Sequence, residues 1–309
     1  MAVIEIAKPS PTSRRWRETL RQVRRNWSAY LFLTPGLIHF AIFTLFALGF
    51  AFYISFQKWN IVQPATFVGL ENYLRLFRDA RFHRAVGNTL LFMIGVPLNL
   101  ASGLAVALLL NTKVRGQAIF RTMFYIPVVT PLVVSSIIWK WVYQGDYGLL
   151  NYYLLKLGII QEKIVWLANP DLALPALIIM GIWGGTGSTM VIYLAGLQSI
   201  PEEMYDSAKV DGANAFQRLI YVTIPLLAPT TFFLFVTSVI GTFQIFTQVY
   251  IMTNGGPLNR TTTIGYYLYE KAFRQLDMGY ATAMAFALFA MIFVFTVLQM
   301  KFTRGDIEY

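Results

Sequence analysis

Six long stretches of this chain contain no charged residue, and they limit its fold more than any other feature. A membrane-spanning helix needs about 20 apolar residues to cross ~30 Å of hydrocarbon, and buried helices of a soluble protein would show polar faces that these stretches lack. The charge-free runs have 32, 28, 18, 30, 41 and 23 residues, at 26–57, 85–112, 122–139, 172–201, 219–259 and 278–300. They predict an all-α, polytopic membrane protein with six transmembrane helices near 30–56, 87–110, 123–143, 173–197, 226–252 and 280–301.

Composition argues against a soluble enzyme. Of the 309 residues, 56% are hydrophobic and 13% charged, whereas soluble domains carry about 25% charged residues. The absence of cysteine excludes thiolate catalysis and cysteine metal sites, and two histidines are too few for a histidine metal cluster. No P-loop pattern is present, so we expect this chain to bind no ATP. The sequence predicts no catalytic residue, no metal ligand and no cofactor.

The basic residues predict the orientation. Residues 1–29 carry seven Lys and Arg against two Glu, which favours a basic cytoplasmic N-terminal tail. Because six spans return the chain to its starting side, 303–309 would be a cytoplasmic C-terminal tail after a membrane domain over 30–302. The net charge of +10 is then explained by cytoplasmic flanks rather than by nucleic acid. Arginines at every third position from Arg75 to Arg84 predict one amphipathic helix over 71–85 at the outer interface.

The segment between the fourth and fifth spans, about 199–224, is unusually polar for a connector. Ser199 and Glu202 have the spacing of a capping box, which predicts a helix over 201–211. Gly212 would end that helix in a left-handed conformation. A second short helix is expected over 214–222, before the chain re-enters the membrane at Pro225. The two helices would form a compact knob on the cytoplasmic side.

This segment also resembles a known family. Asp206-Ser207-Ala208, three residues and then Gly212, followed by Ile224-Pro225-Leu226, is similar to the EAA loop of ABC importer permeases, with Asp206 and Ser207 departing from the Glu and Ala of that pattern. Further motifs of the carbohydrate-uptake branch, with its MalF-like and UgpA-like subunits, occur at 34–36, 67–73, 88–89, 126–127, 253–257 and 278–281. The resemblance covers about 30–302.

The resemblance implies a transport subunit rather than an enzyme. It would form half of the translocation pathway of a binding-protein-dependent importer, in a prokaryotic inner membrane, working by alternating access. The expected partners are a second homologous permease, a cytoplasmic ABC ATPase dimer that uses ATP and Mg, an extracytoplasmic solute-binding protein and a sugar. In that family the EAA helix docks in a cleft of the ATPase, and Asp206 would replace the Glu that pairs with a basic residue there. The expected coupling residues are Glu202, Glu203, Tyr205, Asp206, Ser207, Ala208, Asp211 and Gly212.

Substrate contacts are expected at membrane depth, in the stretches that line the sugar pocket of the maltose-type relative. The fourth span offers Gly184, Gly185 and Ser188, and the fifth offers Ser238, Thr242, Phe243 as an aromatic platform, and Gln244. Other roles remain open. The glycines could serve close helix packing, and the hydroxyls of Ser238 and Thr242 could bond to their own helix.

Alternative functions also remain open at this point. Glycerol-3-phosphate or another polyol could replace the sugar. A secondary carrier or a membrane-embedded enzyme would need ionisable groups inside the membrane, and the six charge-free runs contain no Asp, Glu, Lys or Arg.

Overall fold

The first unit of the chain is one long apolar helix. The computed structural model describes residues 25–112 and 116–303, so most of the predicted N-terminal tail and the residues from 304 onward lie outside the described part. The chain divides into two compact units, Met1–Ile54 and Ser55–Tyr309. In the first, α2 (Trp27–Phe40) continues through a π-helical segment (Ala41–Phe46) into α3 (Ala47–Ser55). Most of its apolar side chains are exposed, as suits a helix that faces lipid or other membrane helices.

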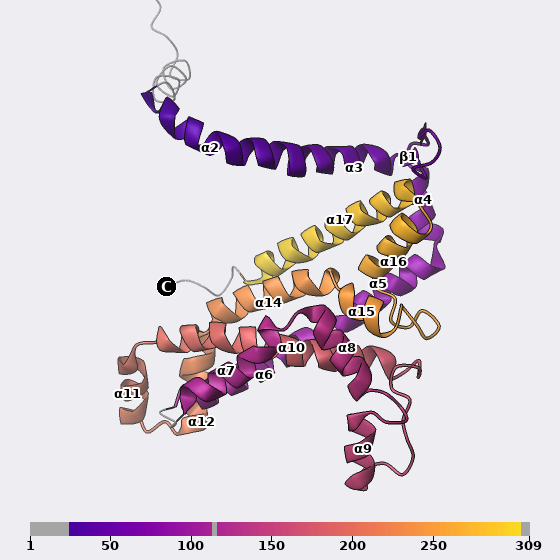
Figure 1. The fold of residues 1–309 in the computed structure, drawn as a ribbon. Helices are drawn as coiled ribbons and strands as arrows, with labels where there is room; N and C mark the ends of the chain where they lie inside the picture. Colours follow the sequence, from indigo (N-terminus) through magenta and orange to yellow (C-terminus); the bar gives the residue numbers. More distant parts are fainter. Residues whose placement is uncertain (1–24, 113–115, 304–309) are drawn as a thin grey trace, which may run out of the picture. The chain divides into compact units, whose positions relative to one another are not determined.

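The second unit contains the other long helices (Figure 1). They are α5 (Ala80–Phe92) with α6 (Gly95–Leu110), α10 (Ala173–Gln198) and α17 (Met278–Thr303). Among the described residues, four helices are long and apolar enough to cross a membrane. The number rises to six if each of two bent pairs is one span, namely Gln117–Val129 with Leu132–Val142 and Ala215–Leu226 with Ala228–Phe243. The helices expected near 87–110, 173–197 and 280–301 are therefore confirmed as helices.

The third expected span is broken. Instead of one helix over 123–143, α7 (Gln117–Val129) and α8 (Leu132–Val142) meet at an angle of 98°. Pro131 has no N–H to continue the helix, and it forces the preceding Thr130 into an extended conformation (ψ 126°). The prediction of a continuous helix is wrong here.

The fifth expected span is also interrupted. α14 (Ala228–Phe243) ends at Phe243, and the short helix α15 (Thr247–Met252) follows after the three non-helical residues 244–246. The hydroxyl of Thr263 donates a hydrogen bond of 2.7 Å to the carbonyl oxygen of Ile245. This bond satisfies a backbone group that the break leaves without a helical partner.

Two smaller predictions need correction near the start of the second unit. The helix expected over 71–85 is two helices, because Asp79 leaves the helical conformation between α4 (Glu71–Arg78) and α5 and caps α5. A short antiparallel pair, β1 (Gln57–Lys58) and β2 (Thr66–Phe67), adds a strand pair to a fold expected to be all helical. The remaining helices of the second unit include α9 (Leu149–Lys156) and α16 (Ile264–Tyr269).

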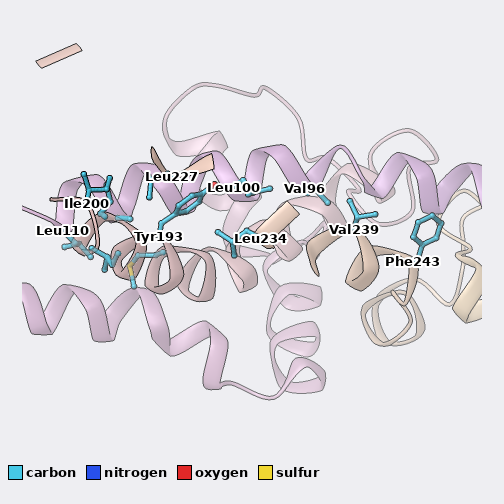
Figure 2. Close-up of a cluster of buried hydrophobic side chains, with 13 residues drawn as sticks. Val96, Leu100, Leu110, Tyr193, Ile200, Leu227, Leu234, Val239 and Phe243 are labelled. Atoms are coloured by element: carbon cyan, nitrogen blue, oxygen red, sulfur yellow. The ribbon is translucent and has the colours of Figure 1, made fainter. Parts of the chain in front are cut away.

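The main core fills the space between α6, α10 and α14. Figure 2 shows side chains of the three helices meeting along their length, with Tyr193 and Phe243 among the largest that are fully buried. α6 and α10 pack along each other in Figure 1, and α11 (Glu202–Val210) and α12 (Ala215–Arg218) lie at one end of α10. The helix pair therefore lies next to this core, and Tyr205 of α11 packs against it.

Candidate functional site

The expected knob is present as a helix pair, which we call the coupling knob (residues 202–223). Gly212 has φ +80°, as expected for a helix stop. The capping box expected at Ser199 and Glu202 is wrong, because the Ser199 hydroxyl donates to the carbonyl of Gly196 and closes α10 instead. A capping box does occur one helix later, between Asn214 and Gln217 at the start of α12.

The coupling knob is held together from inside and is exposed outside. The hydroxyls of Tyr205 and Thr223 lie 3.1 Å apart and join α11 to the π-helical turn (Leu219–Thr223) that follows α12. Asp206 forms an ion pair of 2.7 Å with Lys209, and both side chains are more than half exposed. Such exposed pairs contribute about 0–1 kcal/mol. The Asp206 carboxylate can therefore change partner at little cost.

Apolar side chains on the coupling knob also face outward. Val210 is 88% exposed and Tyr221 76%, and Met204 and Phe216 are exposed as well. Clustered exposed apolar groups among charged residues are typical of a protein–protein contact. The acids Glu202 and Glu203 lie in the first turn of α11, where they complement the positive end of the helix. Ser207 and Asp211 are exposed, and Ala208 is half-buried.

Two cavities lie beside α10. The first has a volume of about 330 Å³ and lies between α6, α10, α14 and the start of α15. The second, of about 450 Å³, lies between α10 and the break from α7 to α8. Gly185 lines both cavities. Gly184 lines the second, and Ser238 and Thr242 line the first.

The other predicted pathway residues lie elsewhere. The hydroxyl of Ser188 donates to the carbonyl of Gly185 in its own helix. Phe243 is fully buried, and its ring packs against Phe295 of α17 at 5.3 Å between centroids. It offers no open face here, and its expected role as an aromatic platform stays a prediction. Gln244 is exposed at the end of α14 and lines neither cavity, and its part in transport stays a prediction.

Both broken helices end at these cavities. Pro131 and the residues around it line the second cavity, and Ile245 lines the first. The two segments after the breaks, α8 and α15, pack against each other. Non-helical backbone at membrane depth is tolerated where it lines a cavity, and broken helices mark the substrate sites of many transporters. Gln248, the second residue of α15, lines both cavities. The sequence carries no signal for this position, because the break that places Gln248 there is not marked by glycine or proline.

A polar cluster fixes the start of α5 against α16 and α17. The carboxylate of Asp79 accepts hydrogen bonds from the hydroxyls of Tyr267 (2.6 Å) and Tyr280 (2.7 Å) and from two backbone N–H groups of α5. Burial alone would raise the pKa of Asp79, but these hydrogen bonds outweigh it and hold the pKa below 3.8, the value for a free aspartate. Arg81 forms two bonds of 2.6 Å with Glu270 beside it. We call Asp79, Tyr267 and Tyr280 the aspartate latch.

Replacing Asp79 by Ala is expected to destabilise the protein by about 3 kcal/mol. The variant loses a helix cap, which contributes about 1 kcal/mol, and leaves two buried tyrosine hydroxyls without their acceptor, at about 1–3 kcal/mol each. Since the folded state lowers the pKa of Asp79, the stabilisation is present above the unfolded pKa and is lost as pH falls through the folded value, below about pH 4. Thermal unfolding of the purified protein at pH 7 measures the loss, and an unchanged midpoint would show that the latch is dispensable.

The fold and site define a membrane transport subunit: apolar helices, two of them broken at small cavities, with an exposed helix pair at one end. Residues 99–305 match the family described as "Binding-protein-dependent transport system inner membrane component". The chain belongs to this family.

Relatives support this assignment over nearly the whole chain. The chain is 36% identical to a probable ABC transporter permease, YesP of Bacillus subtilis, with 94% of each chain covered. It is 36% identical to the lactose transport system permease LacF of Rhizobium radiobacter (90% of this chain, 94% of that one) and 31% identical to the trehalose/maltose permease MalF of Thermococcus litoralis (89% and 93%). The expected resemblance to sugar permeases is confirmed.

Solved structures agree in fold. A chain of a bacterial ABC transporter involved in import of the acidic polysaccharide alginate superposes with a TM-score of 0.82 at 23% identity, covering 94% of this chain and 100% of that one. A chain of a bacterial alginate ABC transporter in complex with an alginate pentasaccharide-bound periplasmic protein superposes with a TM-score of 0.79 at 23% identity, covering 93% of this chain and 99% of that one.

Proposed function

We propose that this chain is the permease subunit of an ATP-driven importer for a sugar or oligosaccharide. The observation that carries the proposal is the near-complete match to permeases named for lactose, diacetylchitobiose and trehalose/maltose. The chain forms half of a pathway that opens alternately to each side of the membrane. Energy comes from ATP and Mg on a separate ATPase dimer, because this chain has no P-loop.

The proposed complex has three further kinds of partner. A second permease completes the pathway, and the apolar, outward-facing helix α2–α3 is suited to contacts within such a membrane assembly. An ABC ATPase binds the coupling knob, whose exposed apolar groups and exchangeable Asp206 carboxylate suit a protein contact. A solute-binding protein delivers the sugar from outside.

The proposed topology has six spans, with each bent pair counted as one. The coupling knob and both termini are cytoplasmic. The basic N-terminal segment supports this orientation, because positive residues are retained on the cytoplasmic side. The loop around Gln161, between α9 and α10, is then extracytoplasmic.

Cysteine labelling tests this orientation, since the native chain contains no cysteine. Val210→Cys on the coupling knob and Gln161→Cys are both at exposed positions. In intact cells, a membrane-impermeant maleimide should label Gln161→Cys and should label Val210→Cys only after the membrane is permeabilised. Labelling of Val210→Cys in intact cells would place the coupling knob outside, where no ATPase could bind it.

A further inference from the structure

The two cavities beside α10 share a polar side chain. Gln248 lines both of them, together with Gly181 and Gly185. Its side chain is 6% exposed, and its Nε2 atom would lie 4.0 Å from a Cβ built on Gly181. The amide therefore lies against the glycine face of α10, where no side chain of Gly181 or Gly185 separates it from the cavities.

Among the described residues 25–112 and 116–303, none forms a hydrogen bond with the side-chain amide of Gln248. Its amide atoms are also not among the fully buried unpaired ones, so they are open to the cavities that the residue lines. The other amide of the first cavity, on Asn99, is engaged at both ends: Nδ2 donates to the carbonyl of Ile182 (3.1 Å), and Oδ1 accepts from Thr189 (2.7 Å). The hydroxyl proton of Thr242 is also engaged, since the hydroxyl donates a hydrogen bond to the carbonyl of Ser238 (2.9 Å). Gln248 thus differs from its neighbours in having unused hydrogen-bonding capacity.

The cavities contain no ionic complement for a charged ligand. None of the described residues that line them is Asp, Glu, Lys, Arg or His. Burying an anion without a cation or a set of donors is strongly unfavourable. A primary amide both donates and accepts hydrogen bonds, as a sugar hydroxyl does, so the two are complementary without charge.

We infer that Gln248 is a specificity-determining residue that hydrogen-bonds a hydroxyl of an uncharged saccharide as it passes between the two cavities. The inference rests on the proposed function and narrows it, because it favours neutral sugars over phosphorylated polyols and acidic sugars. Gln248 is the point where the broken fifth span, the glycine face of α10 and the break between α7 and α8 meet.

Transport by the complete complex tests this inference. The chain is reconstituted in proteoliposomes with its sister permease, its ATPase and its binding protein, with ATP inside. Uptake is measured for radiolabelled lactose, trehalose and diacetylchitobiose as neutral probes and for sulfoquinovosyl glycerol and glycerol-3-phosphate as anionic probes. The best neutral sugar is then compared with its monodeoxy analogues. Gln248→Ala and Gln248→Asn are compared with Gln161→Ala, a matched amide removal on an exposed loop.

The wild-type complex should import a neutral sugar in preference to both anions, and one deoxy analogue should be transported about tenfold less efficiently, in line with one lost hydrogen bond. Gln248→Ala should raise KM about tenfold and remove that discrimination, Gln248→Asn should retain part of it, and Gln161→Ala should match the wild type. Preference for an anion, or unchanged KM and discrimination in Gln248→Ala, would overturn the inference while leaving sugar import intact. Failure of the wild-type complex to import any of these sugars would contradict the proposed function instead.

Discussion

An Asp206→Lys variant is expected to lose sugar-stimulated ATP hydrolysis almost completely while the chain still inserts and folds. Asp206 is exposed and forms an exposed ion pair with Lys209, so its replacement costs the fold little. If α11 docks in a cleft of the ATPase, the carboxylate is desolvated and needs a cation there. Removing one partner of a buried ion pair costs about 3–5 kcal/mol, and a lysine adds repulsion. The Asp206→Lys variant should therefore fold normally but fail to couple sugar binding to ATP hydrolysis.

The measurement is copurification of the ATPase followed by its turnover with and without sugar-loaded binding protein. Asp146→Lys is the matched control, because Asp146 is an exposed aspartate whose nearest cation, Lys163, is 4.0 Å away. It should copurify with the ATPase and respond to sugar as the wild type does. Full copurification and normal stimulation with Asp206→Lys would mean that the coupling knob is only a connector.

Gly212 supports the same contact by a different means. Its φ of +80° strains any other residue, although a Cβ there would meet no atom within 4 Å. Alanine costs about 1–2 kcal/mol in this conformation. Since the penalty is conformational and the site is exposed, we expect Gly212→Ala to weaken coupling by tilting α11 against α12, with less effect than Asp206→Lys.

A Gly187→Val substitution is expected to prevent the chain from folding. Gly187 is buried where α10 crosses α7, and an added Cβ would overlap the carbonyl oxygen of Phe124 and approach the side chain of Val128 to 2.9 Å. Backbone atoms cannot give way as a flexible side chain can. Overpacking of this kind costs about 3 kcal/mol or more, and Gly187 therefore serves close packing of α10 against α7.

Gly184→Val is the matched control, three residues away on the same helix. A Cβ on Gly184 meets no atom within 4 Å, and the residue lines the second cavity. The variant should fold, although it narrows that cavity. Detergent extraction with size-exclusion chromatography separates the two outcomes: Gly184→Val should elute as a single peak, and Gly187→Val should aggregate or be degraded. Equal elution of both would show that α7 and α10 are free to separate.

The helices could be located from the sequence because charge and hydropathy act locally. The charge-free runs predicted the positions of α6, α10 and α17 correctly. Pro131 gave a visible signal for the break between α7 and α8. The break at Gln244–Phe246 gave none, since no glycine or proline lies there. It is supported by Thr263, 18 residues further along the chain from Ile245, and such a contact cannot be inferred without the fold.

In the candidate site too, features set by neighbouring residues could be predicted and features set by distant contacts could not. The coupling knob could be predicted in outline because helix caps and the glycine stop depend on residues adjacent in sequence. The cap at Ser199 was nevertheless assigned to the wrong helix, since it closes α10. Gln248 could not be distinguished from Gln244 by sequence, because their difference in burial depends on where α14 ends. The aspartate latch joins residues about 190–200 positions apart, so no local sequence pattern predicts it.

ATP-dependent sugar uptake into sealed proteoliposomes tests the central claim most directly. The vesicles contain this chain, its sister permease and the ATPase, with ATP trapped inside and sugar-loaded binding protein outside. A radiolabelled sugar should accumulate inside, and accumulation should stop when ATP, the ATPase or the binding protein is omitted. Accumulation that persists without the ATPase and follows an imposed proton or sodium gradient would contradict the account and show a secondary carrier.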